Sequence, residues 1–212
     1  MYDGPDRHLL HQWVTRSLIK RNIWGSGLDS TLGRIRQAID SKEGARFPVS
    51  AIEQEMAGLG KTLTFEDTEI DELLELKYAG QRTFAVLAIL YPGLDLSKEF
   101  HEDHIFPRSR FTPKRLQEAG VPGDQVEQYR ELVDRLPNLQ LLGGTPNIEK
   151  QAKLPAVWLE GAFPTDEMRK VYQADNDLDG VGLDVLAFCE FFEARKEKMR
   201  ARLTKALASP AV

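Results

Sequence analysis

Two short stretches of sequence decide the fold: residues 100–107, Phe-His-Glu-Asp-His-Ile-Phe-Pro, and residues 136–147, Leu-Pro-Asn-Leu-Gln-Leu-Leu-Gly-Gly-Thr-Pro-Asn. The first is short and ends at a proline, which favours a strand or an extended arm. The second predicts a strand over residues 139–142 that ends at two glycines. The proline after those glycines suits the first turn of a helix, which we expect to run to about Lys153.

The sequence on either side of these stretches is mainly helical in pattern. Apolar residues recur at helical spacing before about residue 97, and five helices are expected there. The segment between the two stretches predicts two short helices, and a long helix is expected at the end after a polar loop. The expected helices cover residues 9–18, 28–39, 49–56, 65–76, 82–91, 113–119, 125–136 and about 183–208.

Composition limits the class of protein. The chain has 212 residues, of which 42% are apolar and 29% charged, as in globular proteins that fill one ordinary domain or two small ones. The longest apolar run, residues 84–91, is far shorter than the roughly 20 residues of a membrane helix. We find no signal-peptide pattern in the first thirty residues, and Cys189 is the only cysteine, which excludes disulfides and cysteine-cluster metal sites. We therefore expect a cytoplasmic protein that has no contact with a membrane.

Net charge gives no sign of a nucleic-acid partner by itself. The formal charge is −5, so a nucleic-acid function has to come from local patches. Residues 104–153 contain eight basic and six acidic residues, so the local net charge is slightly positive and modestly favours phosphate binding.

The first stretch concentrates groups that can carry chemistry. Side chains alternate along an extended segment, so His101 and Asp103 face one way and His104 the other. One group can then hold a divalent cation while the other reaches a water molecule. Taken alone, the segment is equally well interpreted as a charged loop with a few surface hydrogen bonds.

The ordered set of Asp103, His104, Asn138, Asn147 and Lys150 carries a resemblance. An Asp-His-Ile-x-Pro segment, an Asn-Leu-x-Leu-Leu segment, and an Asn and a Lys at a helix resemble an HNH nuclease motif, also called the ββα-metal or His-Me finger. The helix-rich first half followed by this motif is similar to the C-terminal domain of GmrSD-type restriction enzymes and of SspE-type antiphage proteins.

The resemblance implies a fold and a division of the chain. It implies a mainly α protein, in which an N-terminal helical bundle and a ββα-metal (HNH) finger precede a long C-terminal helix. The expected parts are the helical bundle at 1–96, the HNH motif at 97–160 with a helical insertion at 108–137, and a C-terminal helical segment at 161–212 that packs on the bundle.

The resemblance also implies roles for individual residues. Asp103 and Asn147 would be the metal ligands, and His104 would be the general base that activates water. Asn138 would hydrogen-bond the loop backbone and hold the histidine in place, and Lys150 would face a phosphate. Turn and cap chemistry is the alternative interpretation of both asparagines.

Other polar residues are assigned more loosely. His101 is a further candidate metal ligand whose role stays open. Arg108, Arg110 and Lys153 would contact DNA together with Lys150.

The cofactor implied by the resemblance is Mg²⁺ or Mn²⁺. Two protein oxygens leave most of the metal shell to water and phosphate, and Asn in place of His favours a hard metal over zinc. No nucleotide or organic cofactor is expected, because the Gly-Lys-Thr at residues 60–62 has Glu55 where a phosphate-binding loop requires glycine.

The sequence therefore predicts a metal-dependent HNH endonuclease domain that nicks DNA, as the effector of a prokaryotic restriction or antiviral defence protein. The implied partners are DNA, whether modified or foreign, and a ParB-like nucleotide-hydrolysing domain in the same parent protein. Two alternatives remain open: a non-catalytic DNA-binding or interaction module on the same scaffold, and an RNase or toxin with the same finger.

Overall fold

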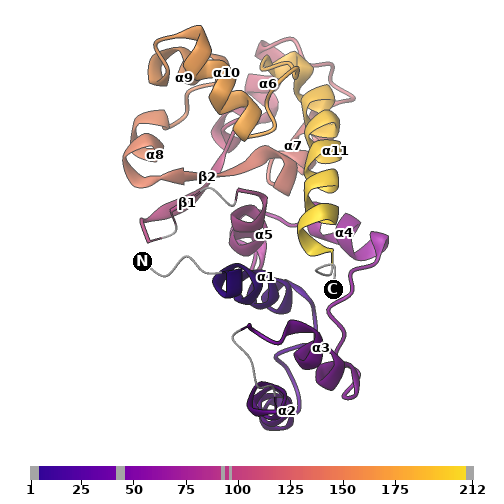
Figure 1. Ribbon diagram of the computed structural model, residues 1–212. Helices are drawn as coiled ribbons and strands as arrows, with labels where there is room; N and C mark the ends of the chain where they lie inside the picture. Colours follow the sequence, from indigo (N-terminus) through magenta and orange to yellow (C-terminus); the bar gives the residue numbers. More distant parts are fainter. Residues whose placement is uncertain (1–4, 42–45, 92–93, 96, 209–212) are drawn as a thin grey trace. The chain divides into compact units, whose positions relative to one another are not determined.

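The computed structural model describes residues 5–41, 46–91, 94–95 and 97–208 (Figure 1). The chain divides into two compact units. The first comprises Met1–Asp67 with Thr204–Val212, and the second comprises Thr68–Leu203. Every residue of the candidate site lies in the second unit.

The first unit is built from three helices: α1 (Pro5–Ile19), α2 (Leu28–Asp40) and α3 (Val49–Ala57). The helices predicted for this part of the chain are confirmed. Their buried apolar side chains, including Trp13, Ile35, Ile52 and Met56, form one core. The ring of Trp13 also packs edge-on against Trp24, with centroids 6.1 Å apart.

The boundary between the units falls between residues 67 and 68, whereas the sequence placed the first boundary at 96 and 97. Almost all of α4 (Asp67–Leu74) and the whole of α5 (Thr83–Leu90) therefore belong with the residues that follow them. The reason is the apolar character of α5, which packs against β2 (Leu139–Gly143) and buries Val86, Leu87 and Leu90.

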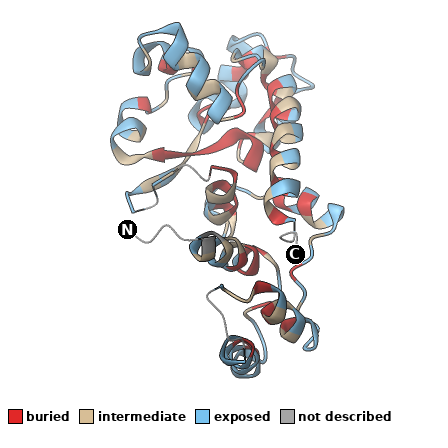
Figure 2. Ribbon diagram, in the orientation of Figure 1, coloured by how far each residue is buried: buried red, intermediate tan, exposed pale blue. Residues whose placement is uncertain are grey.

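The second unit contains a two-stranded antiparallel sheet made of β1 (Phe100–His104) and β2. The first stretch is thus a strand and not an extended arm. The register sets Asp103 opposite Gln140 and His104 opposite Leu139. Strand β2 is buried along most of its length, as the red ribbon in Figure 2 shows. The strand pair is therefore embedded in the second unit.

The insertion between the strands is helical, as predicted. It comprises η1 (Arg108–Arg110), α6 (Pro113–Glu118), α7 (Val126–Leu132) and η2 (Leu136–Asn138). The Thr112 side chain caps α6 by accepting a hydrogen bond from the Arg115 backbone N–H.

Helix α8 (Gly144–Lys150) follows β2 directly, so strand, strand and helix come together in space (Figure 1). We expected this helix to reach about Lys153, but it ends at Lys150. The reason is Gln151, whose backbone has φ 47° and leaves the helical region.

The polar loop expected before the last helix is confined to residues 176–184, and the expectation is wrong for the residues before it. The structure has α9 (Pro155–Ala162) and α10 (Asp166–Asp175) there. Helix α9 starts with a proline in its first turn and buries Trp158 and Leu159, and the Thr165 side chain caps α10.

The last helix, α11 (Phe188–Leu207), starts later than expected because η3 (Val185–Ala187) precedes it, with its first turn capped by Asp184. The buried face of α11 presents Phe188, Phe191 and Phe192 to a core that also contains Phe106, just beyond β1. The rings of Phe106 and Phe191 pack edge-on with centroids 4.8 Å apart. This core holds the end of β1 in place.

Within the described ranges, none of the helices combines the length and the apolar character that crossing a bilayer requires.

Candidate active site

Asp103 lies near the end of β1 with its carboxylate held by two donors. The Gln140 side-chain amide, opposite it on β2, donates to Oδ2 at 2.8 Å. The Nζ atom of Lys150 lies 3.0 Å from Oδ2 and 3.4 Å from Oδ1. The Asp103 side chain is 12% exposed, so the carboxylate is largely shielded but reachable from one side.

Lys150 does not face outward, as the phosphate-binding role would require. Its side chain is 1% exposed, and its ammonium group also donates to the His104 backbone carbonyl. Helix α8 packs on both strands, so its last residue projects toward the sheet rather than into solvent. Burial lowers the pKa of Lys150, and the neighbouring Asp103 carboxylate opposes that shift.

Gln140 is oriented in turn by Tyr172 on α10. The Tyr172 hydroxyl donates to the Gln140 Oε1 atom at 2.6 Å, which leaves the amide NH₂ free to point at Asp103. Burial raises the pKa of Tyr172, so the hydroxyl stays protonated and remains a donor at neutral pH. The sequence did not single out either residue, although the strand register alone places Gln140 beside Asp103.

His104 is held by a carboxylate from the insertion. Its Nε2 atom lies 2.8 Å from Asp134 Oδ1, and its side chain is 13% exposed. Burial lowers the pKa of His104, while the hydrogen bond to Asp134 opposes the shift. The ring is therefore neutral at pH 7. With its proton on Nε2 facing the carboxylate, Nδ1 keeps a free lone pair.

Tyr78, in the segment between α4 and α5, covers one face of the same imidazole. The two ring centroids are 4.6 Å apart. The segment is attached to the site by hydrogen bonds from Tyr78 N to Asp134 O at 2.8 Å and from Ala79 N to Glu102 Oε2 at 2.7 Å. No sequence motif marked Asp134 or Tyr78, and each lies more than twenty residues from His104 along the chain.

Asn138 is fully buried and bonds to the chain that follows His104. Its Oδ1 atom accepts from Phe106 N at 2.9 Å, and its Nδ2 atom donates to Phe106 O at 3.0 Å and to Val133 O at 2.7 Å. The Asn138 backbone carbonyl accepts from Ile105 N at 2.8 Å. One side chain thus connects the segment after β1 with the end of the insertion.

His101 lies toward the opposite end of β1 from His104, and Asn147 belongs to α8, which packs against both strands. Asn147 is half-buried in α8, one turn before Lys150. His101 is exposed, and its Nε2 atom lies 3.5 Å from Glu99 Oε1; a Cβ added at Gly144, where α8 begins, would lie 4.0 Å from the same nitrogen.

The donor types fit a hard divalent cation. Asp103 Oδ1 has a single long contact, and α8, which carries the amide oxygen of Asn147, packs against β1. Among the described residues, no three His, Cys, Asp or Glu side chains converge as a metal site. The cation that lies beside the Asp103 carboxylate is Lys150.

The three other residues predicted to contact DNA are exposed. Arg108 is 68% exposed and has its Nε atom 3.3 Å from Asp134 Oδ2, which places this guanidinium beside the His104–Asp134 pair. Arg110 donates from Nε to Ala152 O at 3.0 Å, next to the exposed Lys153. The structure thus brings Arg110 close to Lys153, and it places the Arg108 guanidinium beside Asp134, the partner of His104.

The last part of α11, from Arg195 to Lys205, is rich in basic residues but offers little to a phosphate backbone in comparison. Arg195 is buried, and four of its other cations are engaged with acidic side chains. These ion pairs are Lys196–Glu75, Lys198–Asp179, Arg200–Asp71 and Arg202–Asp177.

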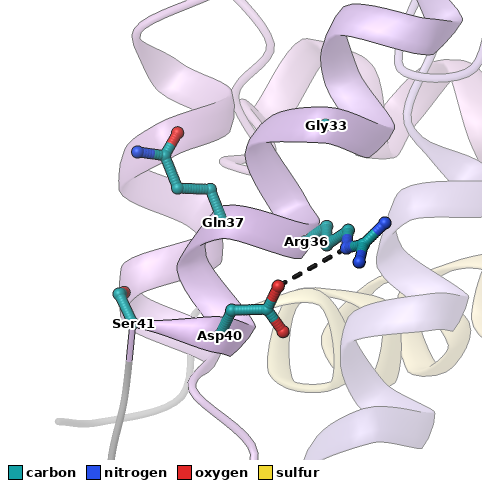
Figure 3. Close-up of a pocket in the computed structure, with 5 residues that line it drawn as sticks. All are labelled: Gly33, Arg36, Gln37, Asp40 and Ser41. Carbon is teal, nitrogen blue, oxygen red and sulfur yellow. Dashed lines mark hydrogen bonds and ion pairs between the residues drawn. The ribbon is translucent and has the colours of Figure 1, made fainter.

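A surface hollow lies elsewhere, on α2 in the first unit (Figure 3). It is lined by Gly33, Arg36, Gln37, Asp40 and Ser41. Arg36 and Asp40 turn toward each other there, with Nε and Oδ2 3.4 Å apart, and both side chains are exposed. None of the predicted site residues lines this hollow.

No protein-family model matches the sequence, and no curated protein matches it.

Proposed function

We propose that this chain is a metal-dependent endonuclease domain of the HNH class that nicks DNA. The observation that supports it most strongly is the pairing of His104 Nε2 with Asp134 at 2.8 Å, on the residue that follows Asp103 in β1. An oriented, neutral imidazole next to an oxygen ligand is what hydrolysis of a phosphodiester requires.

His104 acts as the general base. Its Nδ1 atom takes a proton from a water molecule, and the water oxygen attacks phosphorus as the bond to the leaving sugar oxygen breaks. Asp134 stabilises the imidazolium that forms and keeps the proton of the resting ring on Nε2. Asn138 holds the chain after His104 through Phe106, so the imidazole does not drift.

Asp103 and Asn147 are the residues that would hold Mg²⁺ or Mn²⁺. A hard divalent ion supplies charge neutralisation on the phosphate during in-line displacement. Gln140 and Tyr172 orient the Asp103 carboxylate for this contact.

Arg108, Arg110 and Lys153 supply exposed positive charge for the DNA backbone. One site cuts one strand at a time, so a double-strand break requires two copies or two visits. In a restriction or antiviral protein, the domain would act beside a ParB-like nucleotide-hydrolysing domain of the same parent chain.

The experiment that tests this function is incubation of supercoiled plasmid with the purified chain and Mg²⁺ or Mn²⁺. We expect open circles before any linear DNA, and none when EDTA is present. A parallel digest of RNA separates a DNA nickase from an RNase. Absence of conversion with either metal, in a chain that binds plasmid, contradicts the proposal and favours a non-catalytic DNA-binding module.

Replacing Asp134 with Asn is expected to lower the nicking rate by about 10- to 100-fold, the usual effect of losing a partner that orients a reactive group. The Asp134 carboxylate raises the pKa of His104 against the effect of burial, so its loss lowers that pKa further. The fall in rate at acid pH should therefore move to lower pH. A pH–rate profile with substrate in excess checks this, and an unchanged acid limb would contradict the pairing. Asp124→Asn, at an exposed position of the same insertion, is the control.

Replacing Arg110 or Lys153 with Gln is expected to weaken DNA binding equally for all sequences, because both contact phosphate in this proposal. Each loss should reduce the slope of log K against log salt by about 0.9. Fluorescence anisotropy of a labelled duplex at several salt concentrations measures the slope. An unchanged slope would remove the residue from the DNA contact surface.

A further inference from the structure

Lys150 is the feature of the site that the proposed mechanism leaves unused. Its ammonium lies 3.0 Å from Asp103 Oδ2, and the pair is almost closed to water. The carboxylate also accepts from the Gln140 amide, and the ammonium donates to the His104 carbonyl. Both charges are therefore satisfied inside the protein before any ligand arrives.

We propose that Lys150 keeps the Asp103 carboxylate closed to a divalent cation until a phosphodiester enters, so that metal and nucleic acid load together. This inference rests on the proposed function and concerns the regulation of the same site.

The net charge of the ligand set determines how tightly the site binds a divalent cation. Asp103 contributes one negative charge, Lys150 one positive charge, and Gln140 and Asn147 none, so the ligand set is neutral overall. Affinity for a hard divalent ion depends on the number of charged ligands. A divalent ion at Asp103 would also lie next to the ammonium, where repulsion is weakly screened because Lys150 is buried and Asp103 is largely shielded. The site without a phosphate therefore binds the metal weakly.

A phosphodiester reverses that balance. It brings a negative charge and oxygens that can bind both cations, so the ammonium can turn from Asp103 to the phosphate while the metal takes its place at the carboxylate. Lys150 is the last residue of α8 and Gln151 already leaves the helix, so the side chain sits where the backbone changes course. The original expectation that Lys150 contacts phosphate then describes the loaded state and not the state seen here.

The test measures Mn²⁺ binding and does not depend on cleavage. The full chain carrying His104→Ala, which holds DNA without cutting it, is titrated with Mn²⁺ and followed by electron paramagnetic resonance, with and without a short DNA duplex. We expect the duplex to tighten Mn²⁺ binding about tenfold or more, a coupling in the usual range. By linkage, Mn²⁺ must tighten duplex binding by the same factor, which is an internal check.

Lys150→Met, in the same His104→Ala chain, removes the ammonium and keeps most of the side-chain volume. We expect it to bind Mn²⁺ without DNA about tenfold more tightly than its parent, and to gain less from the duplex. Lys170→Met, at an exposed position of α10 that has no role in the proposed site, is the matched control and should behave as the parent does.

Lys150→Met leaves the Asp103 carboxylate with one donor, so a second variant guards against loss of folding. Lys150→Gln keeps a neutral donor for Asp103 and should tighten Mn²⁺ binding in the same way. Thermal unfolding gives an independent reading, because Mn²⁺ should raise the melting temperature of either Lys150 variant without DNA and leave the parent nearly unchanged.

Equal Mn²⁺ affinity with and without duplex overturns the inference, as does a folded Lys150→Gln chain that binds Mn²⁺ no better than its parent. Either result leaves the nuclease function intact if the wild-type chain nicks plasmid. Absence of Mn²⁺ binding in every variant, even with duplex, overturns both proposals.

Discussion

His104→Ala is expected to lower the rate of metal-dependent plasmid nicking by about 10²–10⁴-fold, the range that general acid–base catalysis contributes. The proposed base is the only group on β1 that the structure both desolvates and orients through a carboxylate, among the residues it describes. Alanine removes the proton acceptor and leaves Asp103 with both of its donors. The loss should therefore fall on kcat, with DNA affinity nearly unchanged.

The second unit should remain folded in this variant. His104 is partly exposed, and Asp134 keeps its contact with Arg108 at 3.3 Å after the imidazole is removed. A melting temperature within a few degrees of wild type checks this. His11→Ala, which removes an exposed histidine in the first unit, is the matched control and should nick at the wild-type rate. Nicking by His104→Ala at the wild-type rate would contradict the mechanism.

The sequence predicted the parts of the fold that depend on local pattern. The five helices before residue 97 follow from apolar spacing, and β2 follows from a short apolar run that ends at two glycines. These signals are local because each element must bury its own apolar face. The strand–strand–helix order around Asp103, Asn138 and Asn147 was implied by the HNH resemblance, because the local pattern left the first strand open between a strand and an extended arm.

The partners of the site residues could not be predicted, because they depend on contacts between distant segments. Asp134 reaches His104 across 30 residues, and Tyr172 reaches Gln140 across 32. Nothing near either residue distinguishes it from other polar positions. Lys150 illustrates the same limit, since the HNH resemblance implied a lysine that faces a phosphate, and the packing of α8 on the sheet turns it inward.

Helices α9 and α10 were missed for a different reason. Both are short, and α10 is largely polar and has none of its described side chains buried, although its few apolar residues share one face. Their start signals were present, since Pro155 and Thr165 occupy the positions that begin each helix. Capping residues would have been the better guide in this segment.

Arg195→Met is expected to destabilise the second unit by about 3–5 kcal/mol, the usual cost of breaking a buried charged network. The guanidinium is fully buried and donates to Pro137 O at 2.6 Å, Leu139 O at 2.8 Å and Asn176 O at 3.1 Å, and to the Tyr91 hydroxyl. Methionine fills the space but leaves these acceptors without a donor. Scanning calorimetry should show a melting temperature lower by about 6–20 °C.

The same variant should also impair nicking, because two of the lost hydrogen bonds flank Asn138. Pro137 and Leu139 are its neighbours on each side, so α11 holds the segment from which Asn138 reaches Phe106. Arg200→Met is the matched control on the same helix. Its pair with Asp71 is partly exposed, at 2.8 Å, and a surface pair of this kind contributes only about 0–1 kcal/mol.

The pH dependence of the stability lost in Arg195→Met separates the effect of the lost charge from the effect of lost packing. Asp177 is buried, its Oδ2 atom has no hydrogen-bond partner, and burial raises its pKa while Arg202 and Arg195 oppose the shift. Removing Arg195 raises that pKa further.

A carboxyl whose pKa is higher in the folded state binds its proton more tightly there. Folding is therefore favoured as the pH falls toward the pKa of Asp in the unfolded chain, about 3.9. The stability difference between Arg195→Met and wild type should therefore narrow as the pH is lowered. A difference that stays constant with pH would show that Arg195 acts only through its hydrogen bonds and packing, and not through its charge on Asp177.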